Sequence, residues 1–288
     1  MTKALVERLL ACADENGFLG YLAMGAGPCF APTWNPFTDI AVPCEAWRLE
    51  TTFRVIRTMN SGAPVMQVST VIPARQGIGI IKYIGVMDSP ERALLIDDFS
   101  DLGDWQSEAP GFPAIGSGPD KPVAYLDSAL WTQGVYTNAF YNESLGVNAS
   151  GFGLGDYLQF FYKVDGGTIE SMEVRFGNDP SNYWKWTVDV STLYQSPPYW
   201  NHLSLLLSEG NPIGNPSLSS QLNYFALRTV KAHDVTEYID RLRLWGASGV
   251  MMASGRIVEF EKQWGEVRTI DVLLEIGPER EGGQNEQH

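Results

Sequence analysis

Short runs of alternating apolar and polar residues fill the stretch from Val174 to Trp245. These runs are rich in Val, Leu, Tyr, Phe and Trp, and segments of Gly, Pro, Asn and Ser separate them. The runs are too short for ordinary helices, and period-two alternation puts apolar side chains on one face of a strand. The stretch therefore predicts antiparallel strands packed into a β-sandwich.

The sequence before this stretch also predicts a mainly β protein, with one helix at its start. Residues 3–15 have an apolar face of helical spacing, and FLGYLAMGAG after them has the pattern of a strand. Residues 28–44 contain several prolines and show no periodicity. We expect this arm to become ordered only against a neighbouring subunit.

The order of the strand patterns predicts a chain in which one domain interrupts another. About eight or nine strand patterns fill residues 93–247, which suits a jelly-roll sandwich closing at IDRLRLW. Two further alternating runs follow, and they do not fit a sandwich that is already closed. We predict a small β frame domain of residues 1–92 and 248–280, an inserted antiparallel jelly roll of residues 93–247, and a disordered tail of residues 281–288.

The net charge limits the partners of the chain. A formal charge of −14 over 288 residues opposes binding to the phosphate backbone of nucleic acids and weakens adhesion to anionic membranes. No apolar run approaches the roughly 20 residues of a membrane span, and the first residues lack the pattern of a signal peptide. We therefore expect synthesis in a cytoplasm, no membrane insertion and no nucleic-acid partner.

The sequence contains no recognisable catalytic constellation. Cys12, Cys29 and Cys44 are odd in number and lack metal-site spacing, so we expect reduced thiols. Glu170 and Glu173 fall on opposite faces of a predicted strand and cannot flank one glycosidic bond together. We expect that the chain is not an enzyme.

The segment FLGYLAMGAGPCFAPTWNPFTDIAVPCEAWRLE resembles the opening of small tail, baseplate and fibre-adaptor proteins of tailed bacteriophages. The matching positions are Gly17, Tyr21, Gly25, Gly27, Asp39, Glu45 and Arg48. IIKYIGVMDSP and GVMMASGRIVEFEKQWGEVRTIDVLLEI resemble two later motifs of that family, although Lys82 and Tyr83 stand where an acidic residue is usual. The resemblance implies a virion protein whose closing hairpin is split by the inserted domain.

The inserted domain is similar to galactose-binding-like and carbohydrate-binding-module jelly rolls. The similarity rests on DDF at Asp97, Trp105, FGNDPSNYWKW, and YID before RLRLW. Many such domains hold a structural calcium ion, and Asp98 and Asp240, with Asp97 as an alternate, fall where its ligands would lie. A hard cation prefers several carboxylate and carbonyl oxygens. The alternative is that these aspartates only lead or cap strands.

Aromatic side chains are the predicted ligand-binding surface of the inserted domain. Sugars stack their C–H faces on aromatic rings, while amides and carboxylates take the hydroxyls. Trp184 and Trp186 share one strand face and Tyr183 takes the other, so one of these faces is core. The predicted binding residues are Tyr183, Trp184, Trp186, Tyr199 and Trp200, with Trp131 and Tyr136 as further candidates. The alternative is that the tryptophans pack in the core.

Together these features predict a structural protein of a phage tail, baseplate or fibre whose sandwich binds host-surface glycan or decorates the particle. Its expected partners are other virion proteins, copies of itself and host polysaccharide, and its expected location is the virion. One alternative is a jelly-roll polysaccharide lyase or hydrolase. Another is a decoration or adaptor protein that binds no sugar, which exposed tryptophans would oppose and a fully buried set would favour.

Overall fold

The computed structural model describes residues 18–26, 45–57, 64–72, 79–99, 101–107, 114–118, 121–127, 136–195, 200–231, 235–249, 251–262 and 266–275. The chain divides into two compact units, which we name the frame (Met1–Pro90 with Ser248–His288) and the insert (Glu91–Ala247). The described elements are antiparallel strands and two short 3-10 turns, so the predicted mainly β fold is confirmed. The predicted helix, arm, tail and three cysteines lie outside the described residues.

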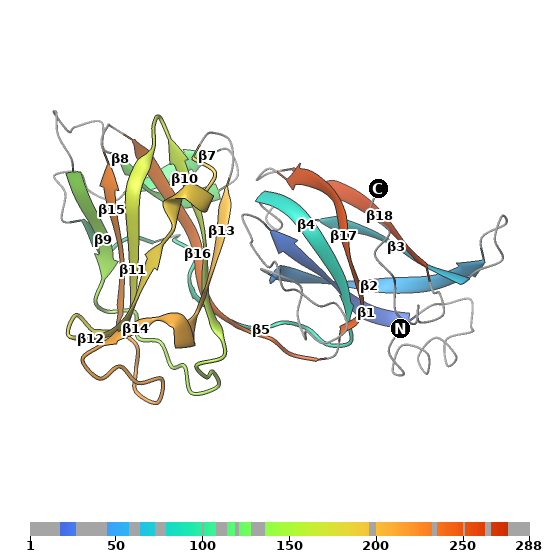
Figure 1. Cartoon of the computed structure of the whole chain (residues 1–288), viewed down its shortest axis with the longest axis horizontal. Coiled ribbons are helices and arrows are strands. Elements are labelled where there is room, and N and C mark those ends of the chain that lie inside the picture. Colours follow the sequence, from blue (N-terminus) through green and yellow to red (C-terminus); the bar gives the residue numbers. More distant parts are fainter. Residues whose placement is uncertain are drawn as a thin grey trace, which may run out of the picture. The chain divides into compact units, whose positions relative to one another are not determined.

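The frame contains a six-stranded antiparallel sheet of order β17-β4-β1-β2-β3-β18 (Figure 1). The strands are β1 (Phe18–Ala26), β2 (Glu45–Arg57), β3 (Pro64–Ile72), β4 (Gly79–Met87), β17 (Met251–Lys262) and β18 (Arg268–Glu275). β1 pairs with a strand on each side, and residues 22–26 are buried whichever face they point to. The nearly continuous apolar sequence of β1 therefore suits a strand covered on both faces.

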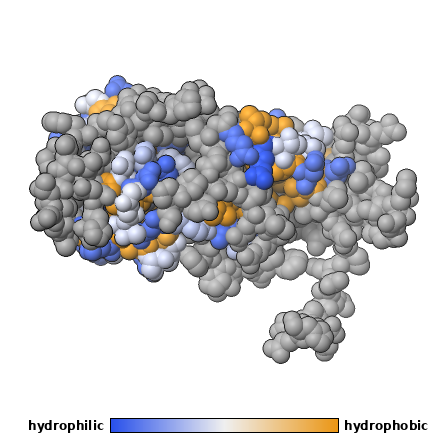
Figure 2. Space-filling view, turned by 90° about the horizontal axis from the view of Figure 1, so that it is seen from above, coloured by the Kyte–Doolittle hydropathy of each residue, from blue (hydrophilic) through white to orange (hydrophobic). Residues whose placement is uncertain are grey.

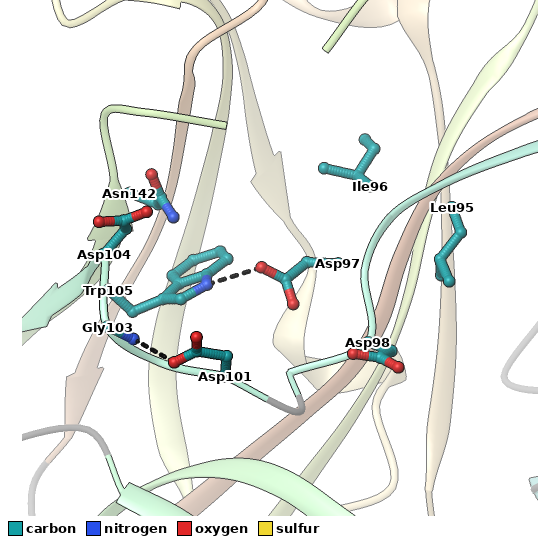
Figure 3. Close-up of a pocket in the computed structure, with 9 residues that line it drawn as sticks. All are labelled: Leu95, Ile96, Asp97, Asp98, Asp101, Gly103, Asp104, Trp105 and Asn142. Carbon is teal, nitrogen blue, oxygen red and sulfur yellow. Dashed lines mark hydrogen bonds between the residues drawn. The ribbon is translucent and has the colours of Figure 1, made fainter. Parts of the chain in front are cut away.

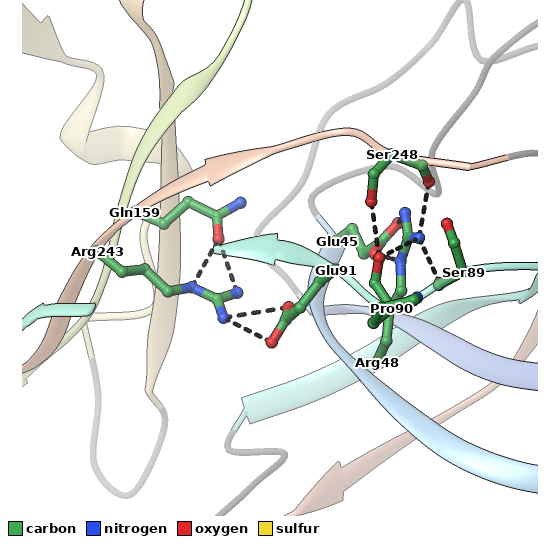
Figure 4. Close-up of polar contacts among 8 residues, drawn as sticks. All are labelled: Glu45, Arg48, Ser89, Pro90, Glu91, Gln159, Arg243 and Ser248. Carbon is green, nitrogen blue, oxygen red and sulfur yellow. Dashed lines mark hydrogen bonds and ion pairs between the residues drawn. The ribbon is translucent and has the colours of Figure 1, made fainter. Parts of the chain in front are cut away.

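Arg48 is buried at the place where the chain leaves the frame after β4 and returns to it before β17. Its guanidinium forms an ion pair with Glu45, three residues earlier on β2. Its Nη1 donates to the carbonyl oxygens of Ser89 at 2.9 Å and Ser248 at 2.8 Å (Figure 4). The Ser248 hydroxyl donates to the Pro90 carbonyl at 2.7 Å. We name this cluster the neck, and it holds together the two chain segments that flank the sequence of the insert.

The insert is a sandwich of two antiparallel sheets. The β10 sheet has the order β13-β10-β16-β8-β7, with β5 pairing to β16, and the β11 sheet has the order β14-β12-β11-β15-β9-β6. The strands are β5 (Arg92–Asp97), β6 (Trp105–Ser107), β7 (Ala114–Gly118), β8 (Lys121–Asp127), β9 (Tyr136–Asn142), β10 (Tyr157–Asp165), β11 (Ile169–Asp179), β12 (Asn182–Val188), β13 (Asn201–Leu206), β14 (Asn211–Ile213), β15 (Tyr224–Lys231) and β16 (Thr236–Gly246). The 3-10 turns η1 (Val190–Thr192) and η2 (Leu207–Glu209) flank β13.

Strand alternation builds the core between the two sheets. Leu158, Phe160 and Tyr162 of β10 face inward at every second position. Val174 and Phe176 of β11 meet them from the other sheet and belong to the same buried cluster. Burying side chains of this size contributes about 1.5–3 kcal/mol each before the entropy of ordering the chain is counted. This shared core holds the two sheets face to face.

A charged network lies inside this core. Lys231 at the end of β15 forms an ion pair with Glu237 near the start of β16. The carboxylate of Glu237 also accepts the hydroxyls of Tyr162 at 2.6 Å and Thr229 at 3.0 Å. Burial, and then the charge of Glu237, holds the pKa of Tyr162 well above its usual value, so its hydroxyl remains a donor. Because β15 and β16 belong to different sheets, the network ties the sheets together where the chain crosses between them.

The described surface carries scattered apolar side chains. The exposed large apolar residues of the described part are Val71, Leu95, Leu154 and Val267. In Figure 2, hydrophilic and hydrophobic residues alternate in small patches over the described part of one face. Within the described ranges, the helices are all too short or too polar to cross a membrane.

Candidate functional site

Trp184 and Trp186 do not form the predicted sugar-binding surface, because both point into the core. They pair with inward-facing Phe176 and Val174 of β11, and alternation gives all four the same side of the sheet. The indole Nε1 of Trp186 donates to the Leu206 carbonyl at 3.0 Å. Packing covers both rings, so a sugar has no ring face to stack on. The alternative, in which the tryptophans pack in the core, therefore holds for these two residues.

The other predicted aromatic residues are also buried or lie outside the described residues. The six tryptophans whose side chains the structure describes are at most 7% exposed, and this burial favours the decoration alternative over a tryptophan surface. Tyr183 packs on the opposite face of β12 against Tyr224, with the ring centroids 5.6 Å apart. Trp131 and Tyr199 lie outside the described residues, and only the backbone of Tyr136 is described.

The three carboxylates predicted to hold calcium are not gathered into one set. Asp97 accepts the Phe99 backbone N–H at 2.6 Å and the Trp105 indole N–H at 2.8 Å. Asp98 is exposed, whereas Asp240 is fully buried on β16. Among the described residues, no group of three or more His, Cys, Asp or Glu side chains could hold a metal ion. Calcium binding stays a prediction, and it would need backbone or water oxygens in addition to these carboxylates.

A cavity of about 400 Å³ lies where β5 ends and β6 begins (Figure 3). Its lining residues are Leu95, Ile96, Asp97, Asp98, Asp101, Gly103, Asp104, Trp105 and Asn142. Burial raises the pKa of Asp97, although the hydrogen bonds from Trp105 and Phe99 lower it in part. Acidic side chains and one edge of the core residue Trp105 thus line the same cavity.

The side of the β10 sheet that faces away from the core carries a second set of polar and aromatic groups, and we name it the outer face. Its described side chains include Tyr157, Gln159, Phe161 and Lys163 of β10, His202 and Ser204 of β13, and Tyr238, Asp240, Arg243 and Trp245 of β16. The middle of this set is buried, whereas Tyr157, Lys163, Ser204, Tyr238 and Arg243 are partly exposed. Partly exposed groups at both ends give the outer face two places for ligand contact.

A β-bulge in β16 determines which of its side chains reach the outer face. Phe161 of β10 pairs with Asp240, and Gln159, two residues earlier on β10, pairs with Arg243, three residues later on β16. Arg241 lies within the bulge and has a positive φ of 50°. Strict alternation from outward-facing Asp240 would turn Arg243 into the core, and the extra residue turns it outward. The bulge therefore delivers a guanidinium to the outer face.

Arg243 completes a hydrogen-bonded row, which we name the polar ladder. The Gln159 Nε2 donates to the Ser204 hydroxyl at 3.0 Å. Arg243 donates to Gln159 Oε1 from Nε at 3.0 Å and from Nη2 at 2.8 Å. Its Nη1 forms an ion pair with Glu91 at 3.3 Å (Figure 4). The ladder thus fixes a hydroxyl, an amide, a guanidinium and a carboxylate in one line across the strands.

Aromatic rings stand at both ends of the outer face. Near the polar ladder, the rings of Tyr157 and Trp245 are tilted with centroids 5.7 Å apart. At the other end, the rings of Trp200 and Tyr238 meet edge to face at 6.3 Å. The Lys163 Nζ lies 4.2 Å from the Tyr238 ring centroid, and burial lowers the pKa of this lysine. Trp200, one of the predicted binding residues, therefore belongs to the outer face. In this aromatic pair, however, Trp200 is buried and Tyr238 has the partly exposed ring.

The polar ladder was not predicted from the sequence. Gln159 is 45 residues from Ser204 and 84 from Arg243, so only strand pairing brings the three together. One signal was available in YIDRLRLW, where the apolar positions Ile239 and Leu242 are separated by three residues instead of two. That irregular spacing indicates an extra residue in the strand. It would have placed Arg243 outside the core.

Comparisons with known proteins give structural likeness alone. No family model and no curated protein matches the chain. The family 11 carbohydrate-binding module of a Clostridium thermocellum cellulase has a TM-score of 0.37 and 13% identity, covering 55% of this chain and 97% of that one. A carbohydrate-binding module specific for non-crystalline cellulose, CBM28, has a TM-score of 0.37 and 16% identity. The match covers 54% of this chain and 95% of that one. A further β-sandwich carbohydrate-binding module has a TM-score of 0.36 and 10% identity. The match covers 80% of this chain and 87% of that one. Likeness at this level says nothing about what the chain binds.

Proposed function

We propose that the insert binds glycan through its outer face, next to the polar ladder. The observation that carries this proposal is the row of Ser204, Gln159, Arg243 and Glu91 beside the half-buried ring of Tyr157. A sugar presents hydroxyls that both donate and accept, together with apolar C–H faces. An arrangement of an aromatic ring beside fixed donors and acceptors is complementary to such a ligand.

The rigidity of the ladder supports the same proposal. Each polar group is held by its neighbour and stands on a paired strand, so little reorganisation is needed when a ligand arrives. The Arg243 side chain is only 11% exposed, which leaves its charge partly desolvated and strengthens its hydrogen bonds. A weak site of this kind gains affinity when many copies bind one surface.

In this proposal, the frame attaches the insert to a larger particle, the virion of a tailed bacteriophage. The sequence resemblance around Glu45 and Arg48 supports this role, and so does the neck, which lets the insert interrupt the frame without opening its sheet. The partners are other virion proteins, copies of the chain, and polysaccharide on the host surface. Mass spectrometry of purified tailed particles from cells that express the chain tests this role. Exclusion of the chain from particles, despite abundance in the lysate, contradicts it.

The glycan proposal is tested on a glycan array with the full chain and two matched variants. Tyr157→Ala removes a half-buried ring from the outer face, and Tyr141→Ala removes a half-buried ring from β9 in the other sheet. We expect Tyr157→Ala to weaken array signals at least about fivefold and Tyr141→Ala to keep them, since stacking on one ring contributes about 1 kcal/mol or more. Equal loss in both variants would contradict the proposed site. A repeat with chelator tests calcium, because unchanged binding rules out a calcium-dependent site.

A decoration or adaptor protein that binds no sugar is the second candidate. The burial of the described tryptophans favours it, since carbohydrate surfaces commonly use exposed aromatic rings. A folded full chain that gives no array signal, but is found in particles, supports this candidate over the glycan proposal.

A further inference from the structure

The ladder end of the outer face contains a buried hydrogen-bond donor that lacks an acceptor. Trp245 of β16 lies two residues after Arg243 and pairs with Tyr157 of β10. Its side chain is 2% exposed, and its indole Nε1 has no hydrogen-bond partner among the described residues. Buried N–H groups are nearly always paired, because an unpaired donor has lost water without gaining a replacement. This donor therefore indicates a ligand that brings an acceptor.

A second donor lies in the neighbouring row of the sheet. The hydroxyl oxygen of Ser204 accepts the Gln159 Nε2–H at 3.0 Å, and no described group accepts the proton of this hydroxyl. Ser204 is partly exposed, so a ligand can reach it. Arg243, in the same row, has only donors. The groups next to Trp245 thus favour a ligand atom that accepts hydrogen bonds over one that donates them.

Apolar side chains surround these donors. Leu206 of β13 pairs with Tyr157 and is partly exposed. Leu95 of β5 pairs with Arg243 and is 56% exposed. The ring of Tyr157 is tilted beside the indole of Trp245, with the centroids 5.7 Å apart. A sugar hydroxyl at this place would point its own proton at apolar groups, whereas a carbonyl oxygen brings no proton. A carbonyl next to a methyl group therefore fits this end better than a hydroxyl.

Glu91 adds an acceptor at the edge of the same site. Its carboxylate forms the ion pair with Arg243 at 3.3 Å, and its side chain is 26% exposed (Figure 4). An ionised carboxylate has about four lone-pair positions, so Glu91 can also accept an N–H from a ligand. An amide offers a carbonyl oxygen and an N–H, whereas an ester offers only the oxygen. The donors and Glu91 together therefore favour an amide.

We propose that the ladder end of the outer face binds an N-acetylated amino sugar. The acetamido carbonyl accepts from Trp245 and Ser204, its N–H donates to Glu91, and its methyl group packs on Tyr157. The sugar is uncharged, so the net charge of −14 does not oppose its binding. This inference rests on the proposed function, and it names the class of sugar that the outer face selects.

The first test is calorimetric titration of the full chain with two β-1,4-linked tetramers, one of N-acetylglucosamine and one of glucose. The two differ only in the acetamido group or hydroxyl at C2. We expect at least about tenfold tighter binding of the acetylated tetramer, because a site with fixed hydrogen-bonding groups discriminates against a ligand that leaves them unpaired. Equal affinities, or a preference for glucose, overturn this inference and leave the proposed function intact. A folded chain that binds neither tetramer and no glycan on the array contradicts both.

Paired variants locate the site. Trp245→Phe removes the indole N–H and keeps an aromatic ring, and Trp200→Phe makes the same change at the other end of the outer face. We expect Trp245→Phe to weaken binding of the acetylated tetramer at least about fivefold and to leave that of the glucose tetramer unchanged. Structural damage would weaken both tetramers and keep the ratio of their affinities. An unchanged ratio in Trp245→Phe, or an equal fall in Trp200→Phe, overturns the assignment.

A second pair of variants tests the hydroxyl donor without altering a buried ring. Ser204→Ala should lower the same affinity ratio, whereas Ser171→Ala, at an exposed position of β11, should not. Equal behaviour of the two serine variants removes Ser204 from the site and overturns the inference.

The last measurement distinguishes an amide from an ester. The methyl glycosides of 2-acetamido-glucose and 2-O-acetyl-glucose both have the carbonyl and the methyl group, but only the first has an N–H. We expect at least about threefold weaker binding of the ester in an NMR titration, because Glu91 then receives no proton from the ligand. Equal binding of the two glycosides overturns the assignment to an N-acetylated sugar.

Discussion

The frame and the insert both bury an ion pair, and the two pairs are connected differently. In the frame, Arg48 pairs with Glu45 on its own strand, and its other described partners are backbone carbonyls of the neck. In the insert, Lys231 and Glu237 pair across two sheets. The other described partners of Glu237 are side-chain hydroxyls. The described hydrogen bonds around the frame pair thus go to backbone carbonyls, whereas those around the insert pair come from side-chain hydroxyls.

This difference determines which network can be replaced. A buried ion pair contributes little to stability compared with well-packed apolar residues, but removing one partner leaves an uncompensated charge. Substitution can remove side-chain partners together with the charge. Backbone carbonyls remain after any substitution and lose their donor. We therefore infer that Arg48 is required at the neck, whereas the charges of Lys231 and Glu237 are exchangeable as a pair.

The largest expected effect is that of Arg48→Met. The change leaves Glu45 buried without its cation and leaves neck carbonyls without a donor, so the frame loses about 3–5 kcal/mol. Hydrogen exchange followed by mass spectrometry measures this, because peptides of β1, β2 and β4 report the frame separately. Arg268→Met is the control, since the Arg268 ion pair is partly exposed, and it should cost less than about 1 kcal/mol. Equal losses in both variants would remove any special role of the neck.

The next effect is that of Glu237→Gln inside the insert. Glutamine keeps the size of the side chain but leaves the Lys231 ammonium buried without its carboxylate, which costs about 3 kcal/mol. Exchange in peptides of β10, β15 and β16 should accelerate, while frame peptides stay unchanged. Glu173→Gln in β11 is the control, because Glu173 is partly exposed beside Arg175. A loss no larger than the control would show that the buried pair carries no strong coupling.

The double variant Lys231→Met/Glu237→Gln tests the comparison directly. It removes both charges, while glutamine can still accept the Tyr162 hydroxyl and donate to Thr229. We expect stability within about 1 kcal/mol of the unaltered chain, well above the Glu237→Gln single variant. The matching frame double, Glu45→Gln/Arg48→Met, should remain destabilised, because the neck carbonyls still lack their donor. Recovery of both doubles, or of neither, breaks the distinction between the two networks.

The sequence predicted the strands far better than the site. Alternation along YLQFFYKVD correctly indicates which residues of β10 face the core, because burial of one face imposes period two. The same period cannot say which face of NYWKW is inside, and Trp184 and Trp186 were assigned to a ligand when they belong to the core. Face assignment depends on the partner strand, which lies far away in the sequence.

Ion pairs and cavities were still harder to predict. Glu45 and Arg48 were noted as positions of a resemblance, but their spacing of three is unusual for partners on a strand, where such residues point to opposite faces. Asp98 and Asp240, with Asp97 as an alternate, were assigned to calcium through the resemblance to galactose-binding-like domains, whereas Asp97 accepts two N–H groups of its own loop. Loop geometry after β5, with Phe99 at a φ of 57°, brings these donors to Asp97. No periodic pattern encodes such a turn.

The smallest expected effect concerns Asp97, which is only part-buried, unlike the buried charges above, and accepts only N–H groups in its described contacts. Burial raises its pKa, and the Trp105 indole lowers it in part. Trp105→Phe removes that donor and keeps a ring to stack on Phe140, so the pKa of Asp97 should rise further. Carboxyl carbon NMR against pH measures the change. Asp179 is the internal reference, because hydrogen bonds from Asn182 and Ser181 lower its pKa at a distant turn.

The sign of the stability effect follows from this shift. A carboxyl group whose pKa is higher in the folded than in the unfolded chain destabilises the fold above both values, and this cost disappears as the pH falls through the folded value. Trp105→Phe should therefore lower stability more at neutral than at acid pH. A pKa of Asp97 that stays constant in Trp105→Phe would show that the indole N–H does not stabilise the charged carboxylate.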